Sequence, residues 1–265
     1  MGVLNVTPDS FSDGGEYNTP EKAVKRAKEM LDEGADYIDV GGESTRPGSE
    51  EITAQDEIKR VLPVIHGIKK QLPQVRISID TWKAEVAKEA LAAGATAVNS
   101  LGGFLFDEKL AEVVKNTHCM MIIYHIKGQP KTMQQGEITY TDVIKEINEF
   151  FESQIAFGEQ HEINREQFVL DPGIGFGKTV EQNIEIIKRF SEFKKLNLPL
   201  LVGVSRKSHL GKILKDELHE KTKPTERLEA SLAETAIAVQ SGAGIVRTHD
   251  IMQTKKFLAV LEKFL

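Results

Sequence analysis

The chain has 265 residues, a formal net charge of −6 and a sequence pI near 5.7. With 40% hydrophobic residues it can bury one large core, and we expect a single domain spanning 1–265. The acidic balance argues against nucleic-acid binding, since no basic face is available to displace counterions. The single cysteine, Cys119, excludes a disulfide framework and a cysteine metal cluster, and it suits the cytoplasm. The longest apolar runs have the length of strands, so we expect neither a signal peptide nor a membrane span.

Short apolar runs alternate along the chain with amphipathic stretches, which is typical of repeated βα units and a parallel sheet. The predicted strands cover residues 2–6, 37–40, 76–80, 97–99, 120–124, 168–170, 200–204 and 244–247. The predicted helices cover residues 20–33, 56–71, 83–93, 107–116, 141–160, 181–194, 225–241 and 253–264. Eight such units predict an α/β fold, a (β/α)₈ TIM barrel with its site at the carboxyl ends of the strands.

The sequence also predicts the length, flexibility or exposure of three connecting segments. Residues 7–19 and 41–52 are rich in glycine and hydrogen-bonding side chains and exceed the usual length of βα loops. We expect these first two βα loops to be flexible and to act as lids or binding loops at the carboxyl face. The charged segment 215–223 is expected to be an exposed loop.

Polar side chains stand at the end of nearly every predicted strand. Single asparagines and aspartates often end strands for local reasons, but a recurrence in almost every unit favours a shared site. These residues are Asn5, Asp39, Asp80, Asn99, His125, Asp171, Lys207, Arg247 and His249.

The stretch 200–208 is the most informative of these strand ends. Its apolar half predicts a buried strand, and Arg206 and Lys207 follow just where that strand should end. Two cations near a helix N-terminus are unfavourable unless an anion or acceptor meets them. We therefore expect Lys207 to contact a ligand.

The segment 171–179 resembles a phosphate-binding loop but lacks one of its glycines. Such a loop needs a glycine five positions before Gly177, and Pro172 occupies that place. Proline also lacks a backbone donor for phosphate. The segment instead suggests that Asp171 accepts from an amino-bearing ring and that Phe176 offers an aromatic face.

Taken together, these motifs resemble those of dihydropteroate synthase, the folate-pathway enzyme that sulfonamides inhibit. They occur in the family's order at residues 5–15 (NVTPDSFSDGG), 39–48 (DVGGESTRPG), 79–81 (IDT), 170–176 (LDPGIGF), 205–208 (SRKS) and 247–250 (RTHD). The resemblance implies a pterin-binding TIM-barrel transferase. Its reaction would join 6-hydroxymethyl-7,8-dihydropterin diphosphate to p-aminobenzoate and release diphosphate, with Mg²⁺ as cofactor.

The resemblance also implies a role for particular residues. The pterin pocket would comprise Asp80, Asn99, Asp171, Phe176, Gly203 and Lys207. The p-aminobenzoate pocket would comprise Thr45, Arg46, Pro47, Phe176, Lys207 and Ser208. Asn5, Arg247 and His249 would hold the diphosphate, with Asn5 also a ligand of Mg²⁺, and the catalytic set would be Asp13, Arg46, Lys207, Arg247 and His249. A homodimer, with no nucleic-acid or membrane partner, is the implied assembly.

Four positions depart from the family's usual residues. Ser100 follows Asn99 where an aspartate is usual, and Tyr124 replaces a methionine before the histidine of strand five. Val204 and His209 replace a threonine and a phenylalanine. These departures bear on p-aminobenzoate affinity and sulfonamide sensitivity more than on the reaction itself. Two alternatives also stay open: a catalytically silent pterin-binding relative, and a methyltetrahydrofolate-dependent corrinoid methyltransferase. The second would give no reason for an anion site at Arg247 and His249.

Overall fold

Parallel strands form the centre of the structure, a computed structural model that describes residues 1–7, 19–44, 51–219 and 221–265. Six strands pair in chain order, and two further strands pair with each other. They are β1 (Gly2–Asn5), β2 (Tyr37–Gly41), β3 (Arg76–Asp80), β4 (Ala97–Leu101), β5 (Met120–Tyr124), β6 (Phe168–Asp171), β7 (Leu201–Val202) and β8 (Ile245–Val246). Each lies where the sequence predicts a strand, with β7 and β8 shorter than expected.

Short contacts on both sides of the β7–β8 pair close the strands into a ring. Leu170 at β6 bridges in parallel to Leu200 just before β7. Gly2 bridges to Thr248, whose carbonyl accepts a hydrogen bond from the Val3 N–H at 3.1 Å. The first strand therefore lies beside the last one, and the predicted (β/α)₈ barrel is confirmed.

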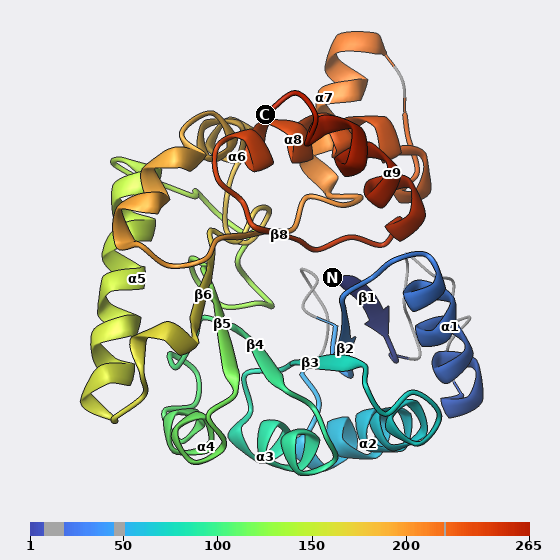
Figure 1. The fold of residues 1–265 in the computed structure, drawn as a ribbon. Helices are drawn as coiled ribbons and strands as arrows, with labels where there is room; N and C mark the ends of the chain where they lie inside the picture. Colours follow the sequence, from blue (N-terminus) through green and yellow to red (C-terminus); the bar gives the residue numbers. More distant parts are fainter. Residues whose placement is uncertain (8–18, 45–50, 220) are drawn as a thin grey trace.

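Helices surround the ring of strands (Figure 1). They are α1 (Pro20–Asp32), α2 (Ala54–Gln71), α3 (Ala84–Ala92), α4 (Leu110–Thr117), α5 (Val143–Gln160), α6 (Val180–Lys188), α7 (Ser208–Leu218), α8 (Leu228–Gln240) and α9 (Ile251–Leu261). Short 3₁₀ helices add η1 (Arg165–Gln167), η2 (Phe190–Leu196) and η3 (Pro224–Glu226). In α1, Thr19 is the N-cap and Pro20 the first residue, as predicted. Among the described residues, no helix is long and apolar enough to cross a membrane.

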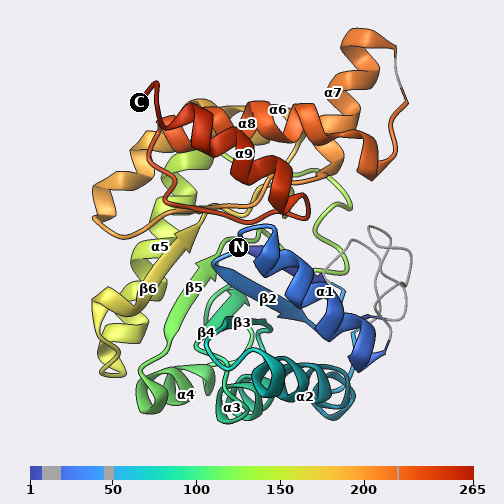
Figure 2. The same cartoon turned by 45° about the vertical axis from the view of Figure 1, so that its right-hand side comes forward.

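Two expectations about helices need correction. The predicted helix 181–194 is two pieces, because Arg189 has φ −106° and ends α6 before η2 begins. The segment 215–223 is not entirely a loop, since α7 continues to Leu218 and projects beyond the other helices (Figures 1 and 2). Gly211 lowers the helix propensity of that stretch, yet a side chain there would clash: its Cβ would lie 2.6 Å from Arg227 Nε. The glycine lets the guanidinium lie against the helix.

Side chains point alternately outward and inward along each strand, which gives one apolar layer outside the ring of strands and one inside it. On β5, Met121 and Ile123 point outward into the main core between strands and helices. Ile122, between them, points inward and packs with Val169 of β6 and Leu201 of β7. This inner cluster closes the barrel interior below the polar residues at the strand ends, so the ring of strands is a packed core with a polar upper layer.

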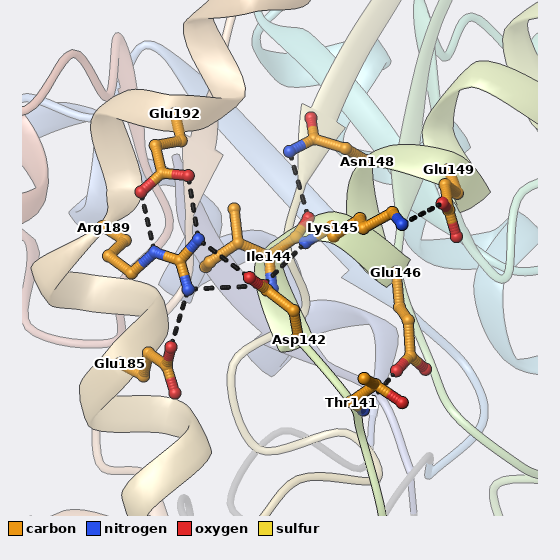
Figure 3. Close-up of polar contacts among 10 residues, drawn as sticks. All are labelled: Thr141, Asp142, Ile144, Lys145, Glu146, Asn148, Glu149, Glu185, Arg189 and Glu192. Atoms are coloured by element: carbon orange, nitrogen blue, oxygen red, sulfur yellow. Dashed lines mark hydrogen bonds and ion pairs between the residues drawn. The ribbon is translucent and has the colours of Figure 1, made fainter.

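Arg189 ties α6 to the beginning of α5 (Figure 3). Asp142 caps α5, where its Oδ1 accepts from two backbone N–H groups at 2.9 and 3.0 Å. Arg189 Nη2 donates to Asp142 Oδ2 at 3.1 Å, and the same guanidinium contacts Glu185 and Glu192, each at 2.7 Å. This junction holds the end of α6 against the beginning of α5.

Candidate active site

A cavity of about 580 Å³ opens at the carboxyl ends of the strands. Asn5 and Asp80 reach it from the ends of β1 and β3, and Arg247 from the residue after β8. Phe176 and Lys207 line it from the segments that follow β6 and β7. The strand register therefore brings together side chains that lie far apart in the sequence, at the face where ligands bind in barrels of this kind.

Arg247 bridges two carboxylates inside the barrel. Its Nε donates to Asp39 Oδ2 at 2.6 Å, and its Nη2 donates to Asp80 Oδ2 at 2.7 Å. Asn99 Nδ2 also donates to Asp39 Oδ2, at 3.1 Å. Asp39 Oδ1 and Asn99 Oδ1 are buried without a hydrogen-bond partner in the part of the chain that the structure describes. Buried acceptors of this kind are costly unless something donates to them, so they mark a place for a ligand or water.

The same cluster has an unusual charge balance. One guanidinium serves two carboxylates, so their charges are only partly compensated. Burial raises the pKa of Asp80 to about 7, although Arg247 acts to lower it. Burial also acts to lower the pKa of the Arg247 guanidinium, but Asp39 and Asp80 together raise it. Arg247 therefore stays charged, while Asp80 can change its protonation near neutral pH.

A buried lysine holds the segment after β6. Lys178 is only 3% exposed, and its Nζ lies 2.9 Å from His125 Nδ1 and donates to the carbonyls of Gly173 and Phe176 at 2.9 and 3.0 Å. Burial lowers the pKa of Lys178 well below its usual value, and burial also lowers that of His125. The lysine of the failed phosphate-loop motif thus points into the protein and fixes the turn that carries Asp171 and Phe176.

Asp171 is the last residue of β6 and directly precedes this turn. Its Oδ1 accepts from the Gly173 N–H at 2.7 Å, and burial raises the pKa of its carboxyl. Gly203 leaves room beside it, since a methyl group there would lie 3.8 Å from both Asp171 Oδ2 and Arg247 Cβ. Asp171 Oδ2 therefore faces the space above Gly203.

The turn after β7 is held by contacts from three neighbouring segments. Arg206 has φ +61°, the left-handed region, and pairs with Asp250 through Nη2–Oδ1 and Nε–Oδ2 contacts of 2.6 and 3.1 Å. Arg227 donates to the carbonyls of Arg206 and Lys207 at 3.2 and 3.3 Å. These contacts orient Lys207, whose Nζ lies 4.2 Å from the centre of the Phe176 ring.

Most of the predicted site residues gather here. Of the pterin set, Asp80, Phe176, Gly203 and Lys207 line the cavity, while Asn99 and Asp171 are buried next to it. Asn5, Arg247, His249 and Ser208 also line it. Ser205 Oγ lies 3.0 Å from His249 Nδ1, which fixes that ring. The predictions for Asp13, Thr45, Arg46 and Pro47, and for the two flexible loops, lie outside the described residues.

Reading the sequence alone missed one polar cluster beside the cavity. Lys83 Nζ contacts Glu43 Oε2 at 2.6 Å and Glu57 Oε2 at 2.8 Å, and Glu43 Oε1 accepts from the Ile52 N–H at 2.9 Å. Burial raises the pKa of Glu57. Glu43 and Glu57 belong to the second βα unit and Lys83 to the third, so no local pattern reveals that the three residues meet.

The structure shows what contacts the four residues that depart from the family's usual ones. Ser100 Oγ donates to the Gly103 carbonyl at 2.6 Å, and Val204 is buried in the core. His209 is buried, with its Nε2 2.9 Å from Glu234 Oε1. Tyr124 faces the cavity, and its hydroxyl donates to Asp80 Oδ1 at 3.1 Å.

Comparison with known proteins places the chain in a family. Residues 1–249 match the family described as pterin binding enzyme. The chain belongs to this family, a class of barrel enzymes.

Within the family, several relatives are dihydropteroate synthases. The chain is 45% identical to a dihydropteroate synthase of Synechocystis over 251 residues, covering 95% of this chain and 84% of that protein. It is 45% identical to that of Escherichia coli over 262 residues, covering 99% and 90%. The structure of the Yersinia pestis enzyme with a sulfonamide drug complex has a TM-score of 0.93 at 39% identity, covering 100% of this chain and 92% of that one. The recognition of the dihydropteroate synthase family, and the prediction of a transferase, are confirmed.

Proposed function

We propose that this chain condenses 6-hydroxymethyl-7,8-dihydropterin diphosphate with p-aminobenzoate to form 7,8-dihydropteroate and diphosphate. The observation that carries the proposal is the cavity itself, where buried acceptors and cationic side chains converge at the carboxyl ends of the strands. A solved relative from Xanthomonas albilineans, 32% identical with a TM-score of 0.85, is in complex with 7,8-dihydropteroate. This chain covers 92% of that protein, which supports a pocket for the same product here.

The pterin ring requires a pocket that alternates donors and acceptors. Asp171 Oδ2 lies beside Gly203, which lines the cavity, and suits the 2-amino group and a ring N–H, while Lys207 suits the ring carbonyl. Asn99 Oδ1 has no partner among the described residues and suits a further N–H. A ring lacking one of these groups would leave a buried polar atom unpaired, which is how such a pocket selects its substrate.

The diphosphate is assigned to Asn5, Arg247 and His249, which also line the cavity. Mg²⁺ is proposed as cofactor because Mg²⁺ prefers oxygen ligands and takes many of them from water and substrate phosphates. Asn5 offers one such oxygen at the cavity wall, and a methyl group added at Gly41 would lie 3.5 Å from its Oδ1. One neutral oxygen from the protein fits an ion that is held largely by the substrate. When bound, it would neutralise charge on the leaving diphosphate.

We infer a dissociative displacement. As the C–O bond to diphosphate breaks, negative charge grows on the leaving group, where Arg247 and His249 lie. The electron-poor methylene is then attacked by the neutral amine of p-aminobenzoate, and Phe176, Lys207 and Ser208 line the cavity for that second substrate. Asp13, Thr45, Arg46 and Pro47 are proposed to complete its pocket and exclude water.

The proposed assembly is a homodimer located in the cytoplasm. Large apolar side chains stay exposed on α8 and α9: Ile237 is 45% exposed, Met252 44% and Val260 61%. Apolar side chains gathered on neighbouring helices are typical of a contact surface. Sedimentation at micromolar concentration would test this, and a purely monomeric protein would exclude it. The single cysteine is buried and free, which suits a reducing compartment.

The decisive experiment measures diphosphate release from the dihydropterin diphosphate, with and without p-aminobenzoate, in Mg²⁺ and in excess EDTA. We expect release to require both p-aminobenzoate and Mg²⁺ and to match the dihydropteroate formed. Tight pterin binding without product would instead identify a silent relative, and Ser100→Asp would then be the variant to test. Release that EDTA leaves unchanged would refute the role of Mg²⁺.

A further inference from the structure

Tyr124 connects two parts of the cavity. It is the last residue of β5, and its side chain is buried and faces the cavity. Its hydroxyl donates to Asp80 Oδ1 at 3.1 Å, while Arg247 Nη2 donates to Asp80 Oδ2 at 2.7 Å. Each oxygen of this carboxylate is therefore held by a donor from a different side of the barrel.

The ring of Tyr124 also contacts the aromatic wall. Its centre lies 5.3 Å from that of Phe176, with an angle of 64° between the planes, an edge-to-face contact. Lys207 Nζ is 4.2 Å from the centre of the Phe176 ring. Tyr124 thus stands between the Phe176–Lys207 wall and Asp80, a residue of the predicted pterin pocket.

The Asp80 carboxylate benefits from the Tyr124 hydroxyl as a second donor, because negative groups outnumber positive ones around it. The charged and titratable groups around it are Arg247 after β8, Asp39 on β2, Tyr124 on β5 and Glu57 on α2. Arg247 is shared with Asp39, which it contacts at 2.6 Å. A hydrogen bond to the ionised carboxyl favours that form, so the hydroxyl of Tyr124 supports Asp80 as an acceptor.

We propose that Tyr124 is a positioning residue, whose hydroxyl holds the Asp80 carboxylate in place as an acceptor for the N–H edge of the pterin ring. The inference rests on the proposed function. It makes Tyr124 a specific feature of this pocket, because a methionine at this position could fill space but could not donate.

Tyr124→Phe tests the hydroxyl alone. We expect the KM for dihydropterin diphosphate to rise about three- to tenfold at pH 7, the effect of one lost hydrogen bond of ordinary strength, with the KM for p-aminobenzoate within twofold of wild type. Without the hydroxyl, Asp80 takes up its proton at a higher pH. The acid limb of kcat/KM for the pterin substrate should therefore move upward by about half to one pH unit.

Two further variants separate this role from simple packing. Tyr124→Met supplies apolar volume without a donor and should show the same upward shift of the acid limb. Tyr37→Phe changes a tyrosine at the other end of the barrel, where the Arg76 guanidinium lies 4.7 Å from the ring centre, and should behave as wild type. Thermal melts establish that each variant is folded.

Three outcomes have distinct meanings. An unmoved acid limb and pterin KM in both Tyr124 variants would overturn the inference, and so would an equal rise of both KM values without a pH shift. Failure of the wild-type protein to form dihydropteroate would overturn the proposed function instead. In that case calorimetric binding of the pterin diphosphate across the same pH range tests Tyr124 without turnover.

Discussion

Replacing Lys178 by methionine should loosen the segment that carries Asp171 and Phe176. The methionine keeps most of the buried chain but removes the amine. Three polar partners then lose a contact of 2.9 to 3.0 Å: the His125 ring and the carbonyls of Gly173 and Phe176.

The magnitude follows from these contacts. Each lost hydrogen bond costs about 1 kcal/mol, so three give about 3 kcal/mol. Part of this is offset because the unfavourable burial of the amine is also removed. A net loss of about 2 kcal/mol in the free energy of unfolding corresponds to about 5 °C in Tm for a chain of this size.

The pH dependence distinguishes this contact from ordinary packing. Burial lowers the pKa of Lys178 well below the 10.5 of a free lysine, so between the folded pKa and 10.5 the unfolded chain binds more protons. Wild-type stability therefore gains from rising pH across that window, and Lys178→Met loses this gain. The stability difference between the two proteins should grow from pH 7 to pH 9. A neutral amine also fits the geometry, since it can donate to two carbonyls and accept from an imidazole N–H.

Urea titrations at both pH values, with the KM for the pterin substrate, provide the assay. We expect that KM to rise about tenfold, as one or two contacts to the ring are misplaced. Lys195→Met is the matched control, because Lys195 is exposed and its 3.3 Å contact to Glu152 should contribute at most about 0.5 kcal/mol. If Lys178→Met proved as stable as this control at both pH values, with an unchanged KM, the reasoning would be wrong.

Three further predictions concern the loop, the outer helices and the cavity. Gly173→Ala should reduce the yield of folded protein and the pterin affinity, because Gly173 has φ +68° and an added Cβ would lie 1.9 Å from the His125 carbonyl oxygen. Circular dichroism and calorimetry would check these two effects, and wild-type folding and affinity would contradict the prediction. Asp142→Ala removes the N-cap of α5 and a partner of Arg189, so the free energy of unfolding should fall by about 1 kcal/mol while kcat stays unchanged. A changed kcat would refute a purely structural role for Asp142. Lys207→Met should lower kcat/KM about a hundredfold with little change in Tm, and retained turnover would exclude its proposed role.

Much of the barrel could be read from local sequence. Strand runs such as 120–124 are continuous and apolar because their side chains are buried on both faces, and the structure has β5 at those residues. The polar residues that end the strands were equally visible, since they interrupt apolar runs. The helix α7 was missed because Gly211 weakens its pattern, and only its contact with Arg227 explains that glycine.

The partners of the polar residues could not be read in this way. The two carboxylates of Arg247 lie 208 and 167 residues away, and their positions depend on closure of the ring between β1 and β8. Tyr124 is unusual at its position in the sequence, but the direction in which its ring faces depends on the register of β5 against β4 and β6.

The sequence by itself determined the order of strands and helices, the face on which the site would lie and the family, because these depend on local periodicity and on short motifs. Only the tertiary structure decided which side chains share a proton, a hydrogen bond or a cation. That information resides in distances between strands that the chain visits far apart. Lys178 shows the difference: Pro172 in the sequence rules out a phosphate-binding loop around it, but only packing shows that its amine is buried against three groups of the protein itself.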